Sequence, residues 1–134
     1  MPLKFINPKS LGFPRGYSNG VITEPGARLL FISGQVAWNE QQQIVTDDFA
    51  EQFATALQNL LTVVAEAGGK PTDVARLIIY VTDKSNYQTS AKEVGAHYRA
   101  QMGKHFPAMV LVEVKSLLDD AAKVEIEGMA VLLD

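Results

Sequence analysis

A few glutamates, one tyrosine and one serine have the side chains that could do chemistry in this sequence. Glu113, Glu125 and Glu127 lie in the last two predicted strands, Tyr17 in an irregular loop, and Ser33 near a strand end. A glutamate partly withdrawn from water has a raised pKa and can exchange a proton with a bound water. The set therefore predicts a general acid–base site.

The same glutamates also have a purely structural interpretation. Lys123, Arg76 and Arg15 are available as cationic partners, and ion pairs of this kind are common where subunits meet. Spacing alone does not decide between an acid–base site and a set of ion pairs, so both interpretations stay open.

Composition excludes several other kinds of site. The 134 residues contain no cysteine, which excludes disulfides, thiol nucleophiles and cysteine-ligated metals. His97 is expected on a helix, four residues after Glu93, as a partly exposed ion-pair partner. His105 is expected in a loop, either solvated or touching a cleft. No metal site and no cofactor are therefore expected.

The charge balance bears on partners. Twelve Lys and Arg against fifteen Asp and Glu, a net charge of −3, offer no basic stripe for a phosphate backbone, so no nucleic-acid partner is expected. No apolar run approaches the roughly 18 residues that span a bilayer. The first residues do not resemble a secretory signal. We expect a cytoplasmic protein without a membrane partner.

The elements that must position these residues follow the order β-β-α-β-α-β-β, within one domain over residues 1–134. A turn at residues 24–27 predicts a hairpin between the first two strands. Asp48 predicts the start of the first helix, Gly68 its end, and Ser85 is expected to cap the second helix. The expected strands are residues 18–23, 28–35, 76–82, 109–114 and 123–133.

Right-handed crossovers place both helices on one face of a mixed α+β sheet and leave the other face uncovered. Alternation in the last two strands predicts that the even-numbered residues face the helices. The uncovered face is then expected to carry Met109 and Leu111, with Phe31 or Ile32, beside ionisable groups. Such a face is typical of a subunit interface with clefts at its margins, although single exposed apolar residues on a monomer give the same pattern.

Short motifs occur in order along almost the whole chain. They are Gly16-Tyr17-Ser18, Ile32-Ser33-Gly34-Gln35, Glu66-Ala67-Gly68-Gly69, Ile79-Tyr80-Val81-Thr82-Asp83, Phe106-Pro107-Ala108, Val112-Glu113-Val114 and Val124-Glu125-Ile126-Glu127-Gly128-Met129-Ala130-Val131. In order and spacing they resemble those of the YjgF/RidA/L-PSP family. The resemblance implies a chorismate-mutase-like fold, assembled as a homotrimer with a cleft at each subunit boundary. It also implies cofactor-free hydrolysis of small reactive enamines and imines, such as 2-aminoacrylate, to 2-oxoacids and ammonia.

Carried over position by position, the resemblance assigns roles to four residues. Tyr17 and Ser33 would line the cleft. The backbone of Leu111 would contact the substrate or its water, and Glu125 would hold or activate that water.

The chain departs from the deaminase pattern at two positions. Met109 stands where the family has an arginine that binds the substrate carboxylate, and Ala91 aligns with the family's cleft asparagine. Methionine donates no hydrogen bond, so a bidentate contact worth about 1.5–3 kcal/mol is lost. Arg15, Lys104 or His105 are the candidates to supply another cation. Without one, the pocket favours a less polar or uncharged ligand.

Three functions are compatible with these features. The first is an imine or enamine deaminase of an arginine-lacking branch, with a substrate range altered by Met109. The second is a non-catalytic small-molecule binding or interaction protein, because an apolar pocket beside Met109 and Ala91 can bind without chemistry. The third, an endoribonuclease, rests only on the family's L-PSP label, and the acidic balance disfavours it.

Overall fold

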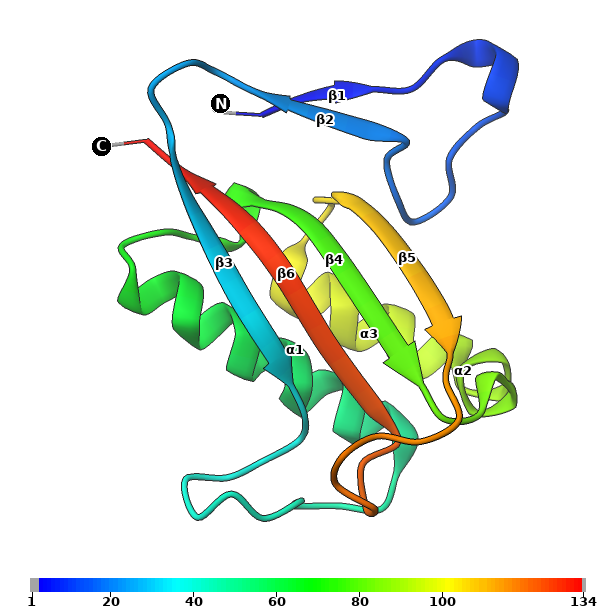
Figure 1. Ribbon diagram of the computed structural model, residues 1–134. Coiled ribbons are helices and arrows are strands. Elements are labelled where there is room, and N and C mark those ends of the chain that lie inside the picture. The colour runs from blue at the N-terminus through cyan, green and yellow to red at the C-terminus, as the bar shows by residue number, and fades with distance from the viewer. Residues whose placement is uncertain (1–2, 134) are drawn as a thin grey trace.

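The computed structural model describes residues 3–133. Within them, the main sheet has four strands in the order β3-β6-β4-β5 (Figure 1). β4 and β5 are parallel, whereas β6 pairs antiparallel with both β3 and β4. The sheet is therefore mixed, as the sequence predicts. Its strands are β3 (Arg28–Gln35), β6 (Val124–Leu132), β4 (Val74–Val81) and β5 (Ala108–Glu113).

The predicted hairpin between residues 18–23 and 28–35 is wrong. β2 (Gly20–Thr23) pairs with β1 (Leu3–Ile6) in a separate two-stranded sheet, which lies across one end of the main sheet (Figure 1). The turn itself forms, since Gly26 has a φ of 84°. A turn reverses the chain but does not decide which strands pair: β2 pairs along all four of its residues with β1, and β3 pairs with the nine-residue β6.

The first helix, α1 (Phe49–Glu66), begins and ends as predicted. The Asp48 carboxylate accepts a hydrogen bond from the backbone N–H of Glu51 at 3.0 Å, which satisfies one of the free donors of the first turn. Gly68 has a φ of 89°, the left-handed conformation that glycine adopts readily after a helix.

The second predicted helix is divided. α2 (Lys84–Thr89) and α3 (Ala91–Met102) meet at Ser90. The Thr89 hydroxyl donates to the backbone carbonyls of the preceding turn, which competes with the regular helical pattern at this point. The predicted cap is also two residues late, because Asp83 and not Ser85 caps α2, accepting from the Ser85 N–H at 2.9 Å.

Two short 3₁₀ helices, η1 (Lys9–Leu11) and η2 (Pro71–Asp73), complete the described elements. None of the helices formed by residues 3–133 has the length and apolar character that crossing a bilayer requires.

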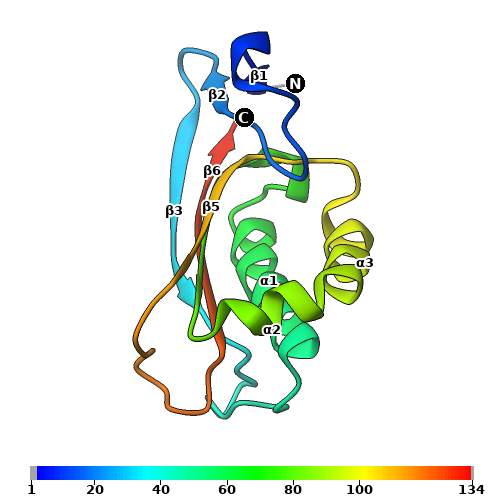
Figure 2. The same cartoon turned by 90° about the vertical axis from the view of Figure 1, so that its right-hand side faces the viewer.

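The three α-helices lie on one face of the main sheet and leave the other face bare, as expected (Figure 2). The core lies between the sheet and the helices. Its members come from α1 and from the helix-facing side of the strands, and they include Phe53, Leu57, Leu60, Leu77, Ile79, Val81, Val124 and Ile126.

The predicted orientation of β5 is wrong. Met109 and Leu111 are opposite Leu77 and Ile79 of β4 in the register, and residues opposite each other share a face. Both therefore pack toward the helices. The sequence suggests the opposite orientation because the charged Glu113 shares a face with Met109 and Leu111, whereas the alternate residues are all valines. Glu113 is tolerated on the helix-facing side because it ends the strand, where its carboxylate accepts from the Lys84 N–H at 2.9 Å.

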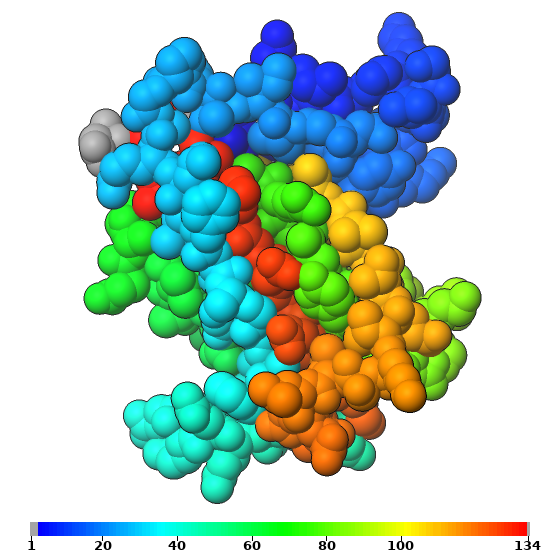
Figure 3. Space-filling view, in the orientation of Figure 1, coloured from blue at the N-terminus to red at the C-terminus, as the bar shows by residue number. Residues whose placement is uncertain are grey.

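The uncovered face, called the open face below, consequently carries other apolar residues than expected. Phe31 is 70% exposed, whereas Ile32 is buried. Val110 and Val112 point to the same side as the β4 residues opposite them, and Leu29 is also exposed. Figure 3 views this face, on which side chains of all four strands are visible with no helix over them. The open face is thus apolar, as the sequence predicts in general.

Candidate functional site

The structure divides the expected site residues into two groups. Tyr17, Met109 and Ala91 lie around the beginning of β5, at the edge of the sheet. Ser33 and Glu125 share another cavity, between the end of β3 and the beginning of β6. These places lie at opposite ends of the sheet (Figure 1), so one copy of the chain does not bring the two groups into one cavity.

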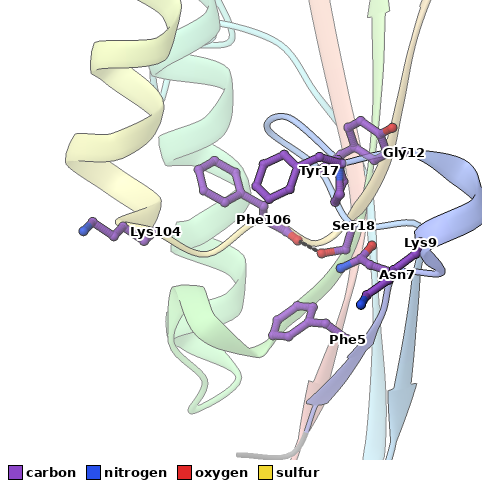
Figure 4. Close-up of a pocket in the computed structure, with 10 residues that line it drawn as sticks. Phe5, Asn7, Lys9, Gly12, Tyr17, Ser18, Lys104 and Phe106 are labelled. Atoms are coloured by element: carbon purple, nitrogen blue, oxygen red, sulfur yellow. Dashed lines mark hydrogen bonds between the residues drawn. The ribbon is translucent and has the colours of Figure 1, made fainter.

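Tyr17 is held beside β5 by its neighbour Ser18. The Ser18 hydroxyl donates to the Phe106 carbonyl oxygen at 2.6 Å, and its N–H donates to the Pro107 carbonyl oxygen at 3.0 Å. Figure 4 shows Tyr17, Ser18 and Phe106 together in a cavity of about 540 Å³ that Lys9 and Phe5 also line. Tyr17 and Met109 line an adjoining hollow of about 380 Å³.

Met109 also borders a cavity of about 290 Å³ on the helix side of the sheet, called the Met109 cavity below. Ala91 lines it from α3, Tyr87 from α2 and Gly16 from the loop before Tyr17. Tyr98 also lines it; its hydroxyl donates to the His105 carbonyl oxygen at 2.6 Å, and burial raises the pKa of Tyr98. Tyr98 is therefore a structural donor rather than a proton-transfer group near neutral pH.

None of the three cations expected to replace the lost arginine lines the Met109 cavity. The Arg15 guanidinium lies over the Phe13 ring, 5.9 Å from its centroid. Lys104 lines the neighbouring cavity of Figure 4. His105 is buried, where its Nε2 donates to the Val74 carbonyl oxygen at 2.6 Å, so the expectation of a solvated or cleft histidine is wrong.

Arg99 of α3 is the cationic residue that sequence reasoning missed. It lies four residues after Gly95 and eight after Ala91, and all three line the Met109 cavity. Spacings of four place residues on one helix face. That spacing was the available signal, although the break at Ser90, which sets where α3 begins, was not visible in the sequence.

Ser33 lies in an irregularity of β3. The register shifts between Ile32 and Gln35, so that one extra residue of β3 bulges opposite β6. Bulges of this kind redirect side chains and are common beside functional sites. Here the bulge places Ser33 and Gly34 in a cavity of about 630 Å³ together with Glu125, called the Glu125 cleft below.

Gly34 lies directly under the Glu125 carboxylate. A Cβ atom at position 34 would be 2.0 Å from Glu125 Oε2, so the carboxylate occupies the space that glycine leaves free. Within residues 3–133, the Glu125 carboxylate has no hydrogen-bond or ion-pair partner, and the residue is half-buried. Such a carboxylate is available to a ligand or a water.

The other two glutamates already have partners. Glu113 accepts from the Lys84 N–H, and Glu127 accepts from the Tyr80 hydroxyl at 2.5 Å. That hydrogen bond is the main cause that raises the pKa of Tyr80. Tyr80 is opposite Glu125 in the register, so the pair adjoins the Glu125 cleft on the sheet.

The ion pairs considered as an alternative for these glutamates do not form within residues 3–133. Lys123 instead contacts the Asp47 carboxylate at 3.1 Å and donates to the Asp47 carbonyl oxygen. In the same part of the chain, no group of three or more histidine, aspartate or glutamate side chains is placed to hold a metal ion.

The chain is a small α+β protein. Helices cover one face of its mixed sheet, and the cavities that hold the candidate residues lie at opposite ends of that sheet. Residues 9–132 match the family described as Endoribonuclease L-PSP. The chain belongs to this family, which is also named Rid or YjgF, and the resemblance noted in the sequence is thereby confirmed.

Individual relatives agree with this assignment. The 2-iminobutanoate/2-iminopropanoate deaminase of Escherichia coli K12 is 35% identical over 106 residues, which cover 77% of this chain and 79% of the relative. YyfB of Yersinia pestis, a Rid-family protein of known structure, has a TM-score of 0.87 and 34% identity, covering 98% of this chain and all of its own. E. coli TdcF, solved with bound serine, has a TM-score of 0.70 and 26% identity, covering 91% and 92%.

Proposed function

We propose that the protein is a cofactor-free imine or enamine deaminase that acts on small molecules in clefts between copies of the chain. The observation that carries this proposal is the half-buried Glu125 carboxylate, which lies over Gly34 without a partner in residues 3–133. Relatives named as imine deaminases support the reaction class. We also propose that the protein acts in the cytoplasm, as expected from the sequence.

The reaction needs only a water and a group that moves its protons. In this proposal Glu125 takes a proton from the water as the water oxygen attacks the imine carbon; the C=N electron pair moves to the nitrogen, and Glu125 returns the proton to that nitrogen. In the resulting carbinolamine, Glu125 takes the hydroxyl proton as the C=O bond forms and gives it to the nitrogen as the C–N bond breaks, so that ammonia and a carbonyl compound are released. Tyr17 and Ser33 orient the substrate and the water, which lowers the entropic cost of the attack.

Two copies of the chain are needed to complete this site. The Ser33 and Glu125 group and the Tyr17 and Met109 group are separated within one copy, but a second copy packed on the open face can bring one group of each together. The exposed apolar side chains of that face favour such packing. A cyclic homotrimer with the chorismate-mutase-like arrangement closes these contacts so that each boundary holds one cleft.

Met109 and Ala91 set the expected substrate range. Both are apolar and both line the Met109 cavity, together with Tyr87 and Phe106. The Met109 and Ala91 side chains cannot hydrogen-bond a substrate, so we expect them to contact an apolar part of the molecule. Preferred substrates are then less polar than 2-aminoacrylate.

A non-catalytic small-molecule binding protein is the alternative function. Met109 and Ala91 favour it, because an apolar cavity binds a ligand without assisting hydrolysis. The variant Met109→Arg separates the two functions. If it gains hydrolysis of 2-aminoacrylate, the remaining catalytic groups are intact, and continued inactivity favours a binding protein.

Ammonia release from freshly generated 2-aminoacrylate, 2-iminobutanoate and a neutral imine tests the proposed reaction. We expect wild-type protein to accelerate at least one of them and Glu125→Gln to lower kcat by about 100-fold or more, the usual contribution of a general acid–base group. Glu24→Gln, in the exposed turn before β3, is the matched control and should leave kcat unchanged. No acceleration of any of these substrates would contradict the proposal.

A further inference from the structure

Arg99 introduces a charge into an otherwise uncharged cavity. Among residues 3–133, it is the one charged side chain that lines the Met109 cavity; the other residues that line it are aromatic, aliphatic or glycine. We infer that Arg99 binds the carboxylate of the ligand in this cavity, in the role that Met109 cannot fill. The inference rests on the proposed function for the class of ligand, which is a 2-imino acid with an apolar side chain.

The absence of a side chain at Gly95 leaves room for the Arg99 guanidinium. In a helix, long side chains extend toward the preceding turn, where the residue four positions earlier lies on the same face. A Cβ atom at Gly95 would be 3.1 Å from Arg99 Nη1, so the guanidinium lies close against the glycine backbone. A larger residue at position 95 would push the guanidinium away from this part of the cavity wall.

The guanidinium is available for a ligand. The Arg99 side chain has no hydrogen-bond or ion-pair partner within residues 3–133, whereas other cations of the chain are engaged, as in the Lys123 contact with Asp47 and the Lys70 contact with Asp73. An arginine presents a rigid fork of donors that matches both oxygens of a carboxylate. No acidic residue lines the cavity, so nothing in it competes for that fork.

The positions of the residues that line the cavity predict the orientation of the ligand. Arg99 approaches from α3, while Met109 lies on β5 and Phe106 just before that strand. A ligand with its carboxylate on Arg99 therefore turns its side chain toward Met109 and Phe106. The cavity volume of about 290 Å³ admits a small acid of this kind.

Binding of a stable product analogue tests the inference without requiring turnover. We would titrate 2-oxobutanoate and its uncharged amide into wild-type protein and into Arg99→Met, following ligand resonances by NMR. The acid should bind wild-type protein and lose about tenfold or more in affinity in Arg99→Met, as expected for a lost charged hydrogen bond, while the amide changes little. Lys92→Met, which removes a charge from an exposed position of α3 outside the cavity, should bind like wild type.

A second variant tests the same role by restoring the cation from another element. In Arg99→Met combined with Met109→Arg, affinity for 2-oxobutanoate should recover. The sedimentation profile and melting temperature of Arg99→Met should match those of wild type, because the Arg99 side chain makes no hydrogen bond or ion pair within residues 3–133. A lower oligomer mass would instead make Arg99 an ion-pair partner between subunits and overturn the inference.

The remaining outcomes separate this inference from the proposed function. If wild-type protein does not bind 2-oxobutanoate, or if acid and amide lose affinity equally in Arg99→Met, the inference is wrong. If the affinity for 2-oxobutanoate depends on Arg99 but no imine is hydrolysed, the inference holds and the proposed deaminase function is wrong. If imines are hydrolysed and Arg99→Met leaves KM unchanged, the function holds and the inference fails.

Discussion

Glu125 and Glu127 are two residues apart on β6 and have different surroundings. The Glu127 carboxylate accepts a hydrogen bond from the Tyr80 hydroxyl. The Glu125 carboxylate has no partner within the described residues, so it is available to a ligand or a water. Residue type and the family resemblance indicate both as candidate site residues, but only the fold shows that their hydrogen-bonding partners differ. The partner of Glu127 lies 47 positions away in the chain, so no local pattern could reveal it.

Tyr80 provides a test of this arrangement through its titration. The hydrogen bond to Glu127 raises the pKa of Tyr80 above its ordinary 10.0, and we expect Glu127→Gln to lower it again. Because the folded protein holds this proton more tightly than the unfolded chain, the resulting stabilisation is complete below pH 10.0 and is lost as the pH rises through the raised pKa. NMR of ¹³C-labelled tyrosine, assigned with Tyr80→Phe, measures the shift.

The matched control for this titration is Glu113→Gln, whose carboxylate contacts Lys84 instead of a tyrosine. It should leave the Tyr80 titration where it is in wild type. An unchanged Tyr80 pKa in Glu127→Gln would show that the hydrogen bond does not persist in solution.

Gly34 gives a second prediction at this scale. In Gly34→Ala the new Cβ would displace the Glu125 carboxylate, since it would lie 2.0 Å from Oε2. The displaced atoms end a flexible side chain, so we expect the melting temperature to change little while deaminase kcat falls by about tenfold or more. Gly20→Ala is the control, because the nearest atom to its Cβ is 3.6 Å away. Full activity in Gly34→Ala would remove Glu125 from the catalytic role.

At the scale of the elements, local signals predicted the structure where a few neighbouring residues decide it. The cap at Asp48, the periodic apolar face of α1 and the stops at Gly68 and Gly103 all formed where expected. The predicted pairing of β2 with β3 is wrong, because β2 pairs with β1 and β3 pairs with β6, strands that are not their neighbours across the turn. The prediction of which β5 residues face the helices is wrong for a similar reason, since the register of β5 with β4, a contact between distant segments, decides it.

The cap at Asp48 predicts a measurable loss of stability. Asp48→Ala removes the acceptor of the Glu51 N–H, and we expect the free energy of unfolding to fall by about 1 kcal/mol. Urea unfolding at neutral pH measures this change. Asp120→Ala, an exposed aspartate outside the helices, should change it by a few tenths of a kcal/mol at most. Equal effects of the two substitutions would mean that the cap does not contribute.

At the scale of the molecule, the account depends on a second copy of the chain. The open face exposes Phe31, Leu29 and Val110, and the two groups of candidate site residues lie apart within one copy. The sequence predicted an uncovered apolar face correctly but named Met109 and Leu111 as part of it, whereas they pack toward the helices. Their place in the Met109 cavity and the core strengthens the need for a partner that supplies Glu125.

Sedimentation equilibrium at low micromolar concentration tests this central claim most directly. We predict a particle of three times the 14.6 kDa of one chain. Phe31→Lys, which adds a charge to the open face, should dissociate it, and Val45→Lys, in an exposed loop, should not. A wild-type protein that sediments as one chain of 14.6 kDa would contradict the account, because its cleft would then have only one wall.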